Sequence, residues 1–148
     1  MSCLVLLPSL LCGAAVCVSD VRSRRVPRAW IAAGWLAQLL ALVVWAVVAN
    51  QLFTVMIAVV ISVGAALLQL LLGLIVPGSL GFGDVTATFM VGLAVGAVGW
   101  LAVLYWWLGM GALGLATIAV GRRMGIRDVP FAPAIVVAGI VAVALAYV

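Results

Sequence analysis

The chain has few charged groups, and several kinds of reactive residue are missing. It has 148 residues, and Asp, Glu, Lys and Arg together make up 7% of them. It contains no histidine, no lysine and no glutamate. Without histidine, neither a Ser-His or Cys-His catalytic pair nor a histidine metal site can be built.

Cysteine is also scarce. The three cysteines, Cys3, Cys12 and Cys17, all lie in the first apolar run, and no two of them form a CxxC pair. This spacing supports neither a zinc site nor a disulfide framework. We expect these thiols to be small buried hydrophobic groups.

Hydrophobic residues, in contrast, make up 70% of the chain. Soluble proteins have about 45–50% apolar and about 25% charged residues, so lipid must be the solvent for most of this surface. In lipid only helices and closed barrels satisfy their own backbone hydrogen bonds, and long continuous apolar runs are typical of helices. The composition therefore predicts an all-α membrane protein with a single domain over residues 1–148.

The number of spans follows from the apolar runs, which cover residues 3–18, 30–49, 52–76, 85–120 and 131–148. The run over 85–120 has 36 residues without a charge. As one helix it would be about 54 Å long, whereas the hydrocarbon core is about 30 Å thick. We therefore expect a break near residues 96–99.

The arginines give the orientation. All seven lie in residues 22–28 or 122–127, a pattern of loops beside an anionic leaflet rather than of nucleic-acid binding. The positive-inside rule places both segments in the cytoplasm, which requires an even number of spans between them. The prediction is six transmembrane helices with the N-terminus and the C-terminus both extracytoplasmic. Asp20 and Asp84 then lie at cytoplasmic ends of spans.

Each of the three acids has a simple structural interpretation. Asp20 is followed by arginines that it balances, Asp84 precedes an apolar run as a helix N-cap does, and Asp128 lies in a loop beside Arg127. The segment before Asp84 contains Gly81 and Gly83, however. Glycines permit backbone conformations closed to other residues and let a peptide pass close to the main chain.

Two aspartates together have a further interpretation, because ionisable groups at membrane depth are costly and mark functional sites. A pair of carboxylates can hydrolyse an amide without metal or histidine: one takes a proton from water and the other protonates the carbonyl. Asp84 at a helix N-terminus favours its role as the base. The arginines near Asp20 favour the opposite assignment, so both remain open.

Two glutamines, Gln38 and Gln69, fall inside apolar runs. Interhelical hydrogen bonding is the usual role of such residues in membrane proteins. The alternative is that they line a path for substrate.

Three segments resemble the motifs of the type 4 prepilin peptidases, a family of membrane aspartic peptidases that is related to the preflagellin peptidases. In the first motif an Asp is followed seven residues on by Pro, as Asp20 is by Pro27. Residues 81–84, Gly-Phe-Gly-Asp, are similar to the family's GxGD motif, and Pro130-Phe131-Ala132-Pro133 resembles its PFGP-type segment. The order, spacing and number of spans agree over essentially the whole chain.

The resemblance implies that the chain removes the short basic leader of type IV prepilins or prepilin-like proteins at the cytoplasmic face of the inner membrane. Asp20 and Asp84 would be the catalytic residues, with the backbone of Gly81 and Gly83 nearby and no cofactor. Thr86 stands where the family often has Lys, and Ala132 where it has Gly. The N-terminal CxxC segment of the larger, methylating members is absent, so a short peptidase-only form is expected.

Other functions compete with this one. Peptidases of the presenilin and signal-peptide-peptidase type also carry GxGD, but their other Asp follows Tyr within a span, whereas Asp20 follows Ser19 at a span end. A non-catalytic membrane scaffold, or a small proton-coupled transporter, would use the same acids. Carriers usually hold such acids near the middle of the bilayer, which favours the peptidase.

Overall fold

The computed structural model describes residues 3–23, 28–75, 81–125 and 131–147. These residues form one 3-10 turn and six α-helices, with no strand among them, which confirms the prediction of an all-α chain. Asp128, Pro130 and the arginines at 24, 25 and 127 lie outside the described residues. The elements are η1 (Cys3–Leu6), α1 (Leu7–Ser23), α2 (Arg28–Ala49), α3 (Leu52–Ile75), α4 (Phe82–Val98), α5 (Trp100–Arg123) and α6 (Ala132–Ala146).

Three of the described helices are long and apolar enough to cross a membrane. They are α2, counted from Ala29, with 21 residues, and α3 and α5 with 24 residues each. At about 1.5 Å per residue, 24 residues reach about 36 Å, more than the hydrocarbon core requires. The apolar helices α1, α4 and α6 are shorter, so the predicted total of six spans stays a prediction.

The long uncharged run over 85–120 divides into two helices where the sequence predicts a break. Helix α4 ends at Val98 and α5 begins at Trp100. Between them Gly99 has φ 131° and ψ −179°, a backbone conformation that is available to glycine and strained for residues with a Cβ. Gly99 thus lets the chain reverse direction without a longer loop.

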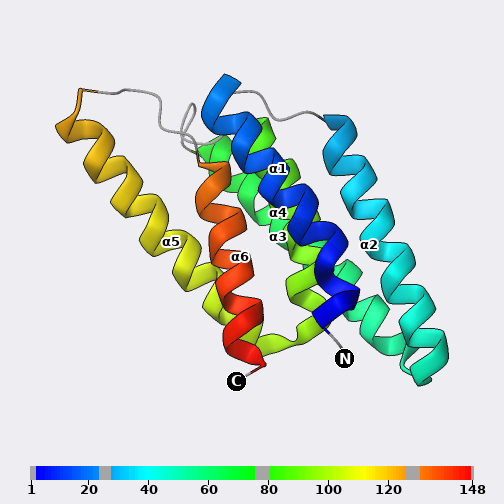
Figure 1. The fold of residues 1–148 in the computed structure, drawn as a ribbon. Coiled ribbons are helices and arrows are strands. Elements are labelled where there is room, and N and C mark those ends of the chain that lie inside the picture. The colour runs from blue at the N-terminus through cyan, green and yellow to red at the C-terminus, as the bar shows by residue number, and fades with distance from the viewer. Residues whose placement is uncertain (1–2, 24–27, 76–80, 126–130, 148) are drawn as a thin grey trace.

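Successive helices run in opposite directions (Figure 1). The C-terminal ends of α1, α3 and α5 lie at the same end of the bundle as the starts of α2, α4 and α6. Both chain termini lie at the opposite end. Helix α1 carries Arg22 in its last turn, α2 begins at Arg28, and α5 ends with Arg122 and Arg123. We call this end of the bundle the arginine end.

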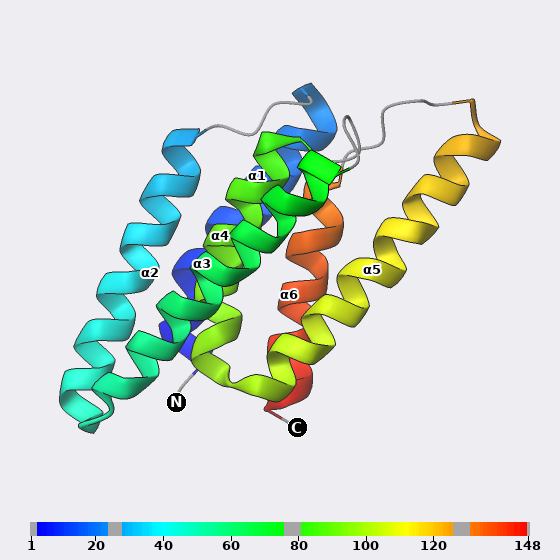
Figure 2. The same ribbon diagram turned by 180° about the vertical axis from the view of Figure 1, so that it is seen from behind.

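Helix α4 is the central element and packs against all five other helices. Eleven of its residues are buried, most of them small or β-branched. Against α3, which runs along it (Figure 2), the contact is through glycine: a Cβ on Gly92 would lie 3.1 Å from Ser62 Cα, and one on Gly96 would lie 3.1 Å from Ala58 Cα. Small residues allow two membrane helices to approach this closely.

Buried polar side chains join the helices at several points. Gln38 of α2 is fully buried; its Oε1 accepts the backbone N–H of Ser9 at 3.1 Å, and its Nε2 donates to Val5 O at 2.8 Å. The Trp106 indole N–H donates to Ile135 O at 2.9 Å, which ties α5 to α6. These groups therefore satisfy their hydrogen-bonding capacity inside the bundle, as buried polar groups require.

Helix α5 leaves the bundle as it approaches the arginine end (Figure 1). In residues 111–123 only Gly114 and Gly121 are buried. A Cβ on Gly114 would clash with the Phe131 ring at the start of α6. At Gly114, therefore, α5 still packs closely against the bundle. The arginine end of α5 is consequently the least covered part of the described helices.

The glycine contact between α3 and α4 makes a prediction about stability. In Gly96→Leu the new side chain meets the backbone of Ala58, and overpacking of this kind costs about 1–3 kcal/mol. We therefore expect a lower temperature of unfolding for the purified protein in detergent. Gly64→Leu is the matched control, because a Cβ at Gly64 meets nothing within 4 Å. Equal losses in the two variants would contradict the contact.

Candidate active site

Asp20 lies within α1, which continues to Ser23, beyond the apolar run that ends at residue 18. The side chain is 8% exposed. Its carboxylate accepts a hydrogen bond from the backbone N–H of Ala132, the first residue of α6. One turn earlier, the Cys17 thiol lies 4.0 Å from Ala132 O. The end of α1 is thus attached to the start of α6, and a helix N-terminus is a favourable place for a carboxylate.

Asp84 lies in the first turn of α4, at the third helical position rather than at the N-cap. Gly81 is the N-cap, and its N–H donates to Asp84 Oδ2 at 2.9 Å. In return the Asp84 N–H donates to Gly81 O at 3.0 Å. The side chain is partly exposed. Asp84 therefore closes its own helix start, and its carboxylate is held at the surface of the arginine end.

The two glycines of the Gly-Phe-Gly-Asp segment have ordinary backbone angles. Gly81 is extended, with φ −81° and ψ 153°. Gly83 lies in the first turn of α4, and positive φ among the described glycines occurs at Gly99 and Gly125. Neither glycine therefore adopts a backbone conformation that is closed to other residues. What Gly81 provides is a bare backbone beside Asp84: a Cβ there would lie 3.4 Å from Asp84 Oδ2.

The structure brings the two acids to the same end of the bundle. Helices α1 and α4, which carry them, are in contact. Each carboxylate accepts a backbone N–H from the start of a helix, Asp20 from α6 and Asp84 from α4. Among the described residues, no three His, Cys, Asp or Glu side chains gather in a group that could hold a metal ion. The arrangement is suited to proton transfer between carboxylates.

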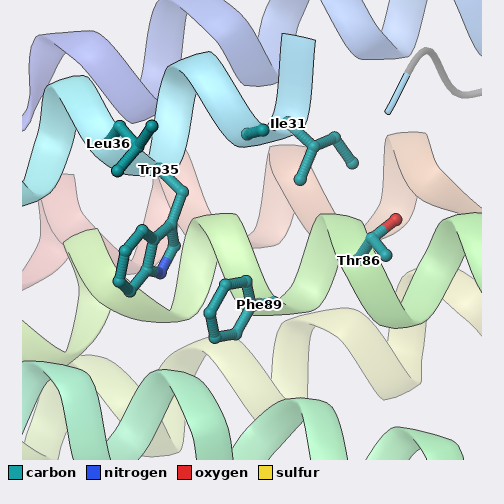
Figure 3. Close-up of a pocket in the computed structure, with 6 residues that line it drawn as sticks. Ile31, Trp35, Leu36, Thr86 and Phe89 are labelled. Atoms are coloured by element: carbon teal, nitrogen blue, oxygen red, sulfur yellow. The ribbon is translucent and has the colours of Figure 1, made fainter. Parts of the chain in front are cut away.

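A cavity of about 290 Å³ lies between α2 and α4 (Figure 3). Trp35 and Phe89 stack in its wall, with ring centroids 5.0 Å apart and an angle of 11° between the rings. The hydroxyl group of Thr86, which lines the cavity, donates to Gly83 O at 2.9 Å. Thr86 is about 200° around the helix from Asp84, so this cavity lies on the other side of α4 from the carboxylate. It is lined by Ile31, Ala32, Trp35, Leu36, Thr86 and Phe89.

The sequence left undecided whether Gln69 bonds to another helix or lines a path for substrate. Gln69 belongs to the buried stripe of α3, which consists of Ala58, Ser62, Ala65 and Gln69 and faces α4. Asp84 is on the stripe of α4 that continues at intervals of four through Thr88, Gly92 and Gly96. The sequence showed Gln69 only as a glutamine in an apolar run, and it gave no indication of which helix this side chain would face.

The described residues thus form a helical bundle with two carboxylates at its arginine end. Comparison of the chain with protein-family models, with curated proteins and with solved structures finds no match. Its function is therefore inferred from the chain's own residues and their arrangement.

Proposed function

We propose that the chain is a membrane-embedded aspartic endopeptidase that removes the short basic leader of type IV prepilins or prepilin-like proteins. The observation that carries the proposal is that α1 and α4, which are in contact, each hold an aspartate at the arginine end, where each carboxylate accepts a backbone N–H from a helix start. Charged side chains at membrane depth are costly and are kept for function. The motifs around both residues resemble those of the prepilin peptidases in order and spacing.

In the proposed mechanism one carboxyl group is ionised and the other is protonated, because two like charges in one poorly solvated site do not both ionise readily. The ionised carboxylate takes a proton from water, whose oxygen attacks the carbonyl carbon of the scissile amide. The protonated carboxyl group donates its proton to the carbonyl oxygen, which gives a tetrahedral intermediate with two hydroxyl groups. As the C–N bond breaks, the carboxyl group that took the proton from water gives it to the leaving amine nitrogen, and the other carboxylate recovers a proton from a hydroxyl group of the intermediate. The N–H groups of Ala132 and Gly81 hold the carboxylates in place. Either aspartate can act as the base.

The proposal includes six spans and a cytoplasmic arginine end. It is supported by the alternating direction of the helices and by the position of Arg22, Arg122 and Arg123 at one end (Figure 1). The helices α1, α4 and α6 have 15–17 residues in their apolar parts, and a bilayer accommodates such short spans by local thinning. A leader that stays in the cytoplasm would then meet the carboxylates where the apolar part of the prepilin enters the membrane.

Labelling from the two sides of the membrane tests this topology. Each new cysteine is placed in a chain whose own three cysteines are replaced by serine. We expect Asn50→Cys, in the exposed α2–α3 turn, to react with a membrane-impermeant maleimide in intact cells. Arg123→Cys, exposed at the end of α5, should react only after the cells are opened. Labelling of both positions from the same side would contradict the six-span arrangement.

Replacing either acid tests the reaction. We expect Asp20→Asn and Asp84→Asn each to reduce leader removal by about 100-fold or more, because general acid–base groups contribute about 10²–10⁴-fold. Cleavage is measured as the loss of the leader on a gel after co-expression with a prepilin. Membrane levels and the temperature of unfolding in detergent should match the wild type. Normal processing by either variant would leave a scaffold or a proton-coupled carrier as the better explanation.

The hydrogen bond between Gly81 and Asp84 makes a separate prediction. Proline lacks the N–H group but fits the φ of −81° at Gly81, so Gly81→Pro removes the donor while keeping the backbone conformation. A hydrogen bond to a charged group contributes about 1.5–3 kcal/mol, so kcat should fall about tenfold or more. Gly81→Ala keeps the N–H and is the control. Equal rates for the two variants in a cleavage assay with purified prepilin would argue against a role for this bond.

A further inference from the structure

Two buried polar atoms in the bundle have no hydrogen-bond partner among the described residues. They are Oε1 of Gln69, on a side chain that is 2% exposed, and Oγ1 of Thr88, on a side chain that is fully buried. Most buried polar atoms in folded proteins have a partner, and those without one need an explanation. Both atoms lie on the stripes through which α3 and α4 face each other.

The amide nitrogen of Gln69 has a hydrogen-bond partner among the described residues, but a weak one. Its one described partner is the thioether sulfur of Met110 in α5, at 3.2 Å, and a thioether is a weak acceptor. Gln38, the other buried glutamine, has strong partners for both amide atoms. Gln38 therefore serves the fold, whereas the carboxamide of Gln69 is buried without the bonds that would justify its burial in an apolar core.

The register of α3 against α4 places Gln69 at about the same level of the bundle as Asp84. The two helices are antiparallel, and Gly92 meets Ser62. Gln69 is seven residues after Ser62, and Asp84 is eight residues before Gly92. At about 1.5 Å per residue, Gln69 and Asp84 therefore lie about 10–12 Å along the helix axes from the contact between Gly92 and Ser62, in the same direction. Thr88 follows Asp84 by one helical turn in α4, on the same stripe.

We propose that Gln69 is a positioning residue that binds a backbone peptide group of the substrate next to the scissile bond. This inference rests on the proposed function. A carboxamide presents one acceptor and a donor side by side, which matches the N–H and C=O groups of an extended peptide. The Thr88 hydroxyl offers a further hydrogen bond at the same level. The groups that lack partners in the free protein thus gain them when substrate binds.

Helix α5 is the cover that the substrate has to displace to reach Gln69. Its described polar contact with Gln69 is the Met110 sulfur, which is cheap to lose. Helix α5 diverges from the bundle toward the arginine end (Figures 1 and 2), and in residues 111–123 only two glycines are buried. A small outward movement of α5 would therefore expose Gln69 while the glycine contacts between α3 and α4 are kept.

The test compares two substitutions of the same kind. In Gln69→Leu we expect the KM for purified prepilin to rise about tenfold or more, with a smaller change in kcat. The temperature of unfolding should be unchanged or higher, because an apolar group replaces a polar group without partners. Gln38→Leu, the control, should lower the temperature of unfolding because it leaves Ser9 N and Val5 O unpaired. Its KM should stay near the wild-type value.

The possible results separate this inference from the proposed function. A wild-type KM in Gln69→Leu, with a loss of thermal stability like that of Gln38→Leu, would show a structural role and overturn the inference alone. Absence of cleavage by the wild-type chain, with prepilins in membranes and in detergent, would overturn the proposed function and the inference together. As a second measure, Gln69→Asn keeps the carboxamide and should have a KM between those of the wild type and Gln69→Leu.

Discussion

The close approach of α4 to its neighbours is the contact on which the rest of the structure depends. In lipid the hydrophobic effect does not draw helices together, so they associate through van der Waals packing of small residues and a few hydrogen bonds. Gly92 and Gly96 give α4 this packing against α3. Because α4 also touches every other helix, its position fixes where Asp84 stands relative to Asp20 on α1 and to the start of α6.

The cost of charge in hydrocarbon explains where the two carboxylates lie. Neither is placed in the middle of its helix: Asp20 lies near the end of α1 and Asp84 in the first turn of α4. At these positions the unpaired N–H groups of helix starts are available, and those of Ala132 and Gly81 serve the acids. Backbone N–H groups at helix starts thus hold both acids, without the need for a side-chain donor.

Buried polar groups in the bundle fall into two kinds. Gln38 and Trp106 have full partners and join helices. Gln69 and Thr88 do not, and they lie in the α3–α4 interface on the side of Asp84. A buried group without a partner lowers stability, and local departures of this kind from a fully satisfied core are typical of functional sites. The divergence of α5 over the same region fits a part of the molecule that has to open.

Composition and charge pattern by themselves determined the all-α class, the helix boundary near Gly99 and the two acids at helix ends, because these depend on local properties of the chain. Helix α1 extends several residues beyond the apolar run, because Asp20 and Arg22 are polar yet continue the helix. The glycines before Asp84 permit unusual backbone conformations, but Asp84 closes that helix start with a standard backbone at Gly81. Only the tertiary structure decided that Asp20 meets Ala132, that the helices of Asp20 and Asp84 are in contact, and that Gln69 is buried rather than exposed to lipid. These contacts join residues far apart in the sequence, and they depend on how the helices rotate and pack, which no local pattern specifies.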